Sequence, residues 1–171
     1  MKQRRITEVV GAMSLLAMFS APVLATETFK APLKGFQEVP AISSTGKGQC
    51  WVESNEVVTA RLSYSGLEGA VTQAHIHFGQ WGVIGGVVLF LCTNVGGPTG
   101  TPSCPQSGEV TRTLTAADVY TGFGSAVAQG IAAGELDEFI KALRKGVAYC
   151  NVHTDTHPVG EIRGQLIRSL K

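Results

Sequence analysis

The sequence of 171 residues contains few charged residues (16%) and few aromatic residues (7%), and its formal net charge is only +1. Nucleic-acid-binding domains normally carry a clustered basic surface, so this composition argues against nucleic acid as a partner. The apolar run at residues 9–25 is interrupted by Pro22 and is shorter than the ~20 residues that a transmembrane helix needs. Hydrophobic residues still make up 44% of the chain, which is enough for one domain with a hydrophobic core.

Several enzyme motifs are also missing from the sequence. It contains no His-Glu-x-x-His zinc-protease motif, no Gly-x-Ser-x-Gly nucleophile elbow and no phosphate-binding loop. The glycines between Gly79 and Gly86 have the wrong spacing for a dinucleotide-binding motif and predict a tight loop instead. The sequence therefore assigns no catalytic residue and favours a non-catalytic protein.

The N-terminal segment has the pattern of a secretory signal peptide. Basic residues precede the apolar run, and Ala25 ends it with a small residue suited to a cleavage site. We therefore expect a signal peptide over residues 1–25 and a single mature domain over residues 26–171. An uncleaved membrane anchor is the alternative, which the short apolar run disfavours. The mature protein is expected in the periplasm or outside the cell, without a stable membrane span.

Four cysteines follow the predicted signal peptide, and an even number in an exported protein favours disulfides over free thiols. Cys92 and Cys104 flank a segment rich in glycine, proline and threonine, so we expect them to pair and close a short loop. A second disulfide, Cys50–Cys150, then follows by elimination. A thiolate metal site is the alternative, but no Cys-x-x-Cys spacing supports it.

Alternation of apolar and polar residues predicts a mainly β protein. Every second residue over residues 58–64 is apolar, which is typical of a half-buried strand. Short strands separated by many glycine-rich turns favour a β-sandwich or a flattened barrel. About eight strands are expected, at residues 29–33, 50–52, 58–64, 71–78, 87–91, 109–114, 147–154 and 161–167.

One or two short helices are expected beside the strands. Residues 135–145 place four apolar residues on one stripe, with acidic residues first and basic residues last, as the helix dipole favours. Gly146 follows at the position of a left-handed C-terminal cap. Residues 115–118 begin like a capping box and predict the second short helix.

All four histidines fall in two short segments. On a strand over residues 71–78, His75 and His77 point to the same face. A neighbouring strand over residues 147–154 would bring His153 beside them, and His157 in the following turn would add a fourth ligand. Imidazole-rich sites suit copper or zinc, so these four residues are the candidate metal ligands.

A structural role is the competing interpretation of the same histidines. Polar networks in proteins also gather such residues, and Asn151, Glu161 and Arg163 are candidates to supply the hydrogen bonds. Glu161 and Arg163 also alternate on one predicted strand face, which favours an ion pair between them. Spacing alone leaves the metal site and the polar network both open.

Several motifs, in order, resemble the chordin-type (CHRD) domain family. The opening strand and Glu-Val-Pro element of that family resemble residues 29–40 (FKAPLKGFQEVP), and its Ala-His-Ile-His-x-Gly motif resembles residues 74–79 (AHIHFG). Its two closing motifs are similar to residues 149–154 (YCNVHT) and 160–166 (GEIRGQL). The resemblance covers nearly the whole mature chain and implies an immunoglobulin-like β-sandwich or barrel. The cysteines depart from the family pattern, which fits added disulfides.

Two functions are expected from these observations. The first is an exported, non-catalytic binding or structural module whose partner the sequence does not identify, because a fold does not imply a function. The second is a periplasmic protein that binds copper or zinc through the histidine cluster. No cofactor other than this metal ion is expected.

Overall fold

The computed structural model describes residues 25–55 and 57–169. The predicted signal peptide lies almost entirely outside the described residues. Within the described part, the strands are β1 (Glu27–Lys34), β2 (Lys47–Ser54), β3 (Val58–Ser65), β4 (Val71–Phe78), β5 (Gly86–Thr93), β6 (Gly108–Leu114), β7 (Ala148–Thr154), β8 (Ile162–Gln165) and β9 (Ile167–Arg168). The helices are α1 (Leu136–Arg144) and the short 3₁₀ helices η1 (Gly35–Gln37), η2 (Ala116–Asp118) and η3 (Ala126–Gln129).

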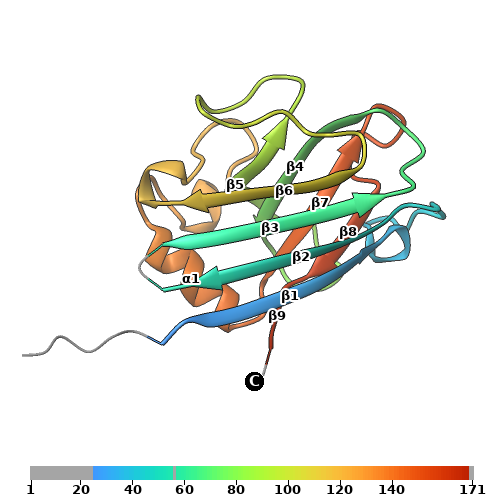
Figure 1. The fold of residues 1–171 in the computed structure, drawn as a ribbon. Coiled ribbons are helices and arrows are strands. Elements are labelled where there is room, and N and C mark those ends of the chain that lie inside the picture. The colour runs from blue at the N-terminus through green and yellow to red at the C-terminus, as the bar shows by residue number, and fades with distance from the viewer. Residues whose placement is uncertain (1–24, 56, 170–171) are drawn as a thin grey trace, which may run out of the picture.

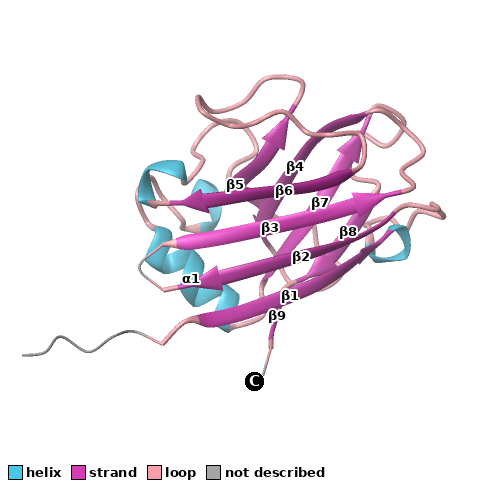
Figure 2. Ribbon diagram, in the orientation of Figure 1, coloured by secondary structure: helices cyan, strands magenta, loops and turns pink. Residues whose placement is uncertain are grey.

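The strands form one antiparallel sheet with the order β5-β4-β7-β8-β1-β2-β3-β6, and β9 pairs with β1. Figure 1 shows that the sheet folds over into two layers. The front layer contains β1, β2, β3 and β6, and the back layer, which crosses it at an angle, contains β4, β5, β7 and β8. Helix α1 lies at one end of the layers (Figure 2). The predicted mainly β, sandwich-like fold is confirmed.

Strand alternation determines which side chains fill the space between the layers. Cys50 of β2 lies opposite Leu62 of β3, and both side chains are fully buried. The adjacent pair, Trp51 and Arg61, points to the outer face of the front layer. A fully buried leucine, isoleucine or phenylalanine contributes about 1.5–3 kcal/mol. Such residues dominate the core and include Phe29, Leu33, Ile76, Leu89, Leu91, Leu114, Phe139, Leu143 and Ile162.

Two disulfides connect separate parts of the fold. Cys50 of β2 is bonded to Cys150 of β7, which joins the front and back layers through the core. Cys92 of β5 is bonded to Cys104 in the loop before β6. Both predicted pairings are confirmed, and no cysteine of the described residues is free.

The predicted helix over residues 135–145 is confirmed as α1, and its apolar stripe packs into the core. Gly146 follows with a φ of +68°, a left-handed conformation that glycine adopts without strain. The second predicted short helix corresponds to η2. Among the described residues, no helix is both long and apolar enough to cross a membrane.

The C-terminal segment differs from the single strand predicted over residues 161–167. It forms β8, which lies between β7 and β1, and then β9, which pairs with β1 nearer to the start of that strand. Leu166 lies between β8 and β9, donates its backbone N–H to the carbonyl oxygen of Ala148, and is fully buried. The short helix η3 was not predicted either, and it ends at Gly130, which has a φ of +96°.

We expect the Cys50–Cys150 disulfide to stabilise the protein more than Cys92–Cys104. A cross-link restricts the unfolded chain more when it closes a longer loop, and the two sequence separations are 100 and 12 residues. The chain-entropy relation gives about 4.7 kcal/mol for a loop of about 100 residues and about 3 kcal/mol for about 15. Urea unfolding of Cys50→Ala/Cys150→Ala should therefore show a larger loss of unfolding free energy than Cys92→Ala/Cys104→Ala. An equal or smaller loss would contradict the expectation.

Candidate functional site

The pairing of β4 with β7 brings three histidines together. In this register His75 lies opposite Asn151, and His153 lies opposite Gln73. Ala74 and Ile76 of β4 point into the core, so His75 and His77 point to the outer face of the back layer. The same alternation in β7 turns His153 outward, because Cys150 and Val152 point inward. The expected neighbour relation between the two strands is therefore present.

The three rings form a compact, buried cluster although they lie on an outer sheet face. Their exposed fractions are only 3% for His75 and 7% each for His77 and His153. One nitrogen from each ring can be chosen so that all three lie within 4.8 Å of one another. The ring centroids of His75 and His153 are 4.9 Å apart, and those of His75 and His77 are 5.4 Å apart.

Backbone carbonyls hold two of the rings in a defined orientation. His77 Nδ1 lies 2.9 Å from the carbonyl oxygen of Gly85, and His153 Nδ1 lies 3.0 Å from that of Pro158. Because a carbonyl oxygen only accepts hydrogen bonds, the network assigns a proton to each of these Nδ1 atoms. The lone pairs of both Nε2 atoms are then directed away from these carbonyls. Such carbonyl contacts orient metal-binding histidines in many proteins.

The Nε2 atoms of the β4 histidines have no hydrogen-bond partner. His75 Nε2 and His77 Nε2 are both buried and unpartnered, whereas His75 Nδ1 lies 3.2 Å from His153 Nε2. A buried polar atom without a partner costs about 1–3 kcal/mol. Two such atoms in one cluster are therefore the strongest sign in this region of a missing binding partner.

Burial keeps the three imidazoles neutral. Desolvation lowers the pKa of His75 to about 2 and that of His77 to about 3. Burial also lowers the pKa of His153. After desolvation, coulombic repulsion from His153 and His77 also lowers the pKa of His75, and repulsion from His153 lowers that of His77. The neutral form is the one that binds metal ions, so no proton has to be displaced from these rings near neutral pH.

Tyr149 and Arg163 support the cluster from one side. The Tyr149 ring is stacked on His77, with 4.7 Å between centroids and 4° between planes. The Arg163 guanidinium lies 3.5 Å from the centroid of the Tyr149 ring and donates to the carbonyl oxygens of Gln80 and Val83. This stack connects the back layer to the loop over residues 79–85, which also carries the carbonyl that binds His77.

The predicted polar network is present only in part. Asn151 reaches the cluster, since its Oδ1 lies 3.0 Å from His153 Nε2. With the His153 proton on Nδ1, both of these atoms are acceptors, so Asn151 donates to this ring only with its amide turned to present Nδ2. Glu161 instead accepts hydrogen bonds from Ser44, Thr154 and the backbone N–H of Glu68.

The expected ion pair between Glu161 and Arg163 is wrong. It does not occur among the ion pairs of residues 25–55 and 57–169. Glu161 precedes β8, so the strand alternation on which the expectation relied does not apply to it.

His157 lies apart from the other three histidines. Its Nε2 is 3.8 Å from Glu68 Oε2, in the turn that follows β7. It is not a member of the buried group. The structure therefore brings together His75, His77 and His153, and it places His157 beside a carboxylate outside the cluster.

Glu38 is a buried charged residue that the sequence reasoning did not assign to the site. Its exposed fraction is 8%, and its Oε1 has no hydrogen-bond partner. Burial raises its pKa to about 7, against the opposing effect of the nearby Arg163 guanidinium. Its position in the Glu-Val-Pro element was the available signal, but nothing local in that element indicates burial beside β7.

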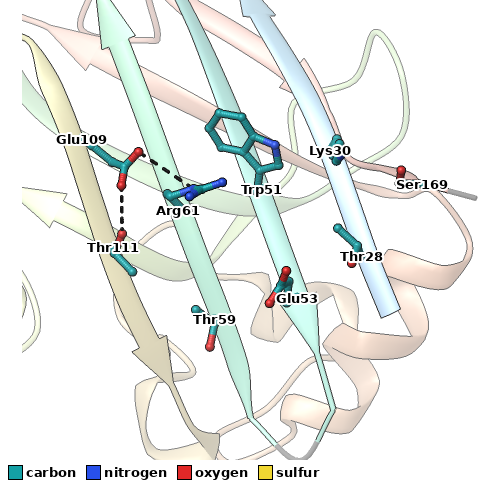
Figure 3. Close-up of a pocket in the computed structure, with 9 residues that line it drawn as sticks. All are labelled: Thr28, Lys30, Trp51, Glu53, Thr59, Arg61, Glu109, Thr111 and Ser169. Carbon is teal, nitrogen blue, oxygen red and sulfur yellow. Dashed lines mark hydrogen bonds and ion pairs between the residues drawn. The ribbon is translucent and has the colours of Figure 1, made fainter. Parts of the chain in front are cut away.

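A hollow of about 670 Å³ lies apart from the histidine cluster, on the outer face of the front layer (Figure 3). Its side chains come from β1, β2, β3 and β6 and from Ser169 after β9, with Trp51 and Arg61 near the centre. The Arg61 guanidinium lies 4.6 Å from the centroid of the Trp51 ring and 3.9 Å from Glu109. These charges are half-exposed and pair with one another, as on an ordinary solvated sheet face.

Replacing Glu38 by Gln should change how the unfolding free energy depends on pH. The pKa of Glu38 is raised from 4.5 to about 7 in the folded protein, so its stabilising contribution is complete below about pH 4.5 and is lost as pH rises through about 7. As the pH rises over this range, the unfolding free energy of Glu38→Gln should therefore increase by up to about 3 kcal/mol relative to that of the parent. Urea unfolding of both proteins at about pH 5 and about pH 8 measures the change. If the difference in unfolding free energy between the two proteins is the same at both pH values, the prediction is wrong.

Comparison with known proteins places the chain in a family. The family model of the CHRD domain matches residues 29–166, which include all three clustered histidines and Glu38. No curated protein and no solved structure matches the chain. Because the matched region covers most of the sequence and nearly the whole sheet, the protein belongs to the CHRD domain family.

Proposed function

We propose that this CHRD-domain protein is exported and binds one copper or zinc ion through His75, His77 and His153. The observation that carries the proposal is the pair of buried, unpartnered Nε2 atoms on His75 and His77, next to His153. In proteins, buried polar atoms nearly always have partners. A metal ion at the centre of the cluster would supply one partner for all three rings.

The geometry of the cluster supports a single ion. Two nitrogens bonded at about 2.0–2.1 Å to a tetrahedral zinc ion are about 3.4 Å apart. One nitrogen from each of the three rings can be chosen so that all three lie within 4.8 Å of one another. Side-chain rotations that shorten the longest separation by about 1.4 Å would complete a site of this size.

The ligand chemistry favours copper or zinc over harder ions. All three ligands are neutral imidazoles, which suit copper and zinc, whereas magnesium and calcium prefer oxygen ligands. Three protein ligands would leave a tetrahedral ion with one further position, which a water molecule or an external ligand would fill. The carbonyls of Gly85 and Pro158 would hold His77 and His153 in the required tautomer.

A non-catalytic binding or structural module without a metal is the other function that the sequence predicts. In that case the three histidines would serve only as buried parts of the sheet. The unpartnered nitrogens of His75 and His77 would then be a permanent cost of about 1–3 kcal/mol each. This cost is why we favour the metal site.

Metal-free protein should melt at a higher temperature when copper or zinc is added. A ligand present at about 100 times its Kd stabilises the folded state by about 2.7 kcal/mol, if it binds only that state. His77→Ala should abolish the metal-dependent rise, because it removes one of three ligands. Thermal unfolding with and without the metal, together with metal analysis of the purified protein, measures both effects.

His157→Ala is the matched control for this experiment. It also removes one imidazole, but from a position outside the buried cluster. We expect this variant to keep the metal-dependent rise of the parent. A parent protein whose melting temperature is unchanged by both metals would refute the proposed function and leave the structural module as the explanation.

Export is the second part of the proposal. Two disulfides are compatible with an oxidising compartment, and the N-terminal pattern predicts cleavage after Ala25. N-terminal sequencing of protein recovered from outside the cytoplasm should therefore begin near Thr26. Recovery of the intact N-terminus in the mature protein would contradict cleavage.

A further inference from the structure

A buried metal site needs a route by which the ion enters, and one cavity is lined by Pro158, whose carbonyl contacts His153. This cavity has a volume of about 180 Å³ and lies between residues 38–42 and residues 156–160. Its walls are largely apolar, and Glu38 is the acidic residue among its lining. A single carboxyl group in an apolar cavity is a natural attachment point for a cation.

Glu38 and Asn151 connect this cavity to the cluster. A Cβ atom added to Gly160 would lie 2.5 Å from Glu38 Oε1 and 2.8 Å from Asn151 Nδ2, so both groups pack against this glycine. On its other side, Asn151 Oδ1 is 3.0 Å from His153 Nε2. Glu38, Asn151 and His153 therefore form a continuous row of polar groups from the cavity to the metal ligands.

Gly160 makes this close approach possible. Its φ of +139° lies in a region that residues with a side chain rarely adopt, and any side chain would collide with both polar groups. The turn also carries Pro158, whose carbonyl orients His153. One turn thus forms a wall of the cavity and holds a ligand of the site.

We propose that this cavity is the route by which the metal ion reaches the cluster, with Glu38 as a transient ligand that passes it on toward Asn151 and the histidines. The inference rests on the proposed metal-binding function. Glu38 Oε1 is buried and makes no hydrogen bond of normal geometry, and the neighbouring Asn151 amide favours the charged form of this carboxyl. A single carboxylate holds copper or zinc less tightly than three imidazoles, so the ion moves inward.

The rate of metal uptake tests the route. Metal-free mature protein is mixed rapidly with Zn²⁺ or Cu²⁺ at about pH 8, above the raised pKa of Glu38. Glu38→Gln keeps the size of the side chain but removes its negative charge. We expect association and dissociation both to slow by about tenfold, with unchanged stoichiometry and Kd, because a transient ligand lowers the barrier in both directions.

Glu68→Gln is the matched control, since it removes the same charge. Glu68 Oε2 lies 3.8 Å from His157 Nε2, and His157 lines the cavity, but Glu68 itself does not. We expect the association rate of Glu68→Gln to stay near that of the parent. An equal slowing in both variants would show a general attraction of cations and would overturn the role of Glu38.

The remaining outcomes separate this inference from the proposed function. If the parent binds metal and Glu38→Gln takes it up at the parent rate, the access route is wrong and the metal site stands. If Glu38→Gln binds more weakly at an unchanged association rate, Glu38 is a permanent ligand and the transient role is wrong. If the parent binds neither metal, the proposed function fails, and the route fails with it.

Discussion

The antiparallel pairing of β4 with β7 is the constraint on which the candidate site depends. Side chains alternate along a strand, so a shift of one residue in the register would turn His153 into the core. The disulfide from Cys150 to Cys50 prevents this shift, because it holds Cys150 on the inner face. Tyr149, Asn151 and His153 must then all point outward. A covalent bond in the core thus determines which side chains reach the site on the opposite face of the same strand.

The loops over this face turn three exposed sheet positions into a buried cluster. The carbonyls of Gly85 and Pro158 come from two separate loops, and each binds one histidine. Arg163 holds the first of these loops in place through the carbonyls of Gln80 and Val83 while it covers the Tyr149 ring. Burial by these loops keeps the imidazoles neutral, and the carbonyls select the nitrogen that stays free. Neutrality and orientation are the two properties that a metal ligand needs.

Local patterns in the sequence were sufficient for most of the strands, for α1 and for the shared face of the histidines. These features depend on contacts between residues that are near in the sequence, as in the period-two alternation of β3 and the apolar stripe of α1. The disulfides were also accessible, because only four cysteines had to be paired. Residues in loops were not predictable in the same way. His157 faces Glu68, Glu161 binds Ser44 and Thr154, and Glu38 packs against Gly160. These contacts join segments that are far apart in the sequence. No periodic pattern of residues indicates which distant segment a loop will pack against.

The two outer faces of the fold differ in a way that bears on function. On the front layer, Arg61 and Glu109 are half-exposed, and water compensates their charges as it does on most sheet surfaces. On the outer side of the back layer, His75 and His77 are buried, and so is Glu38 in the loop after η1, and each has a polar atom without a partner. A fold that needed only stability would place apolar side chains under those loops, because unpartnered buried polar groups weaken it. The proposed metal ion would give the buried nitrogens of His75 and His77 the partner that they lack.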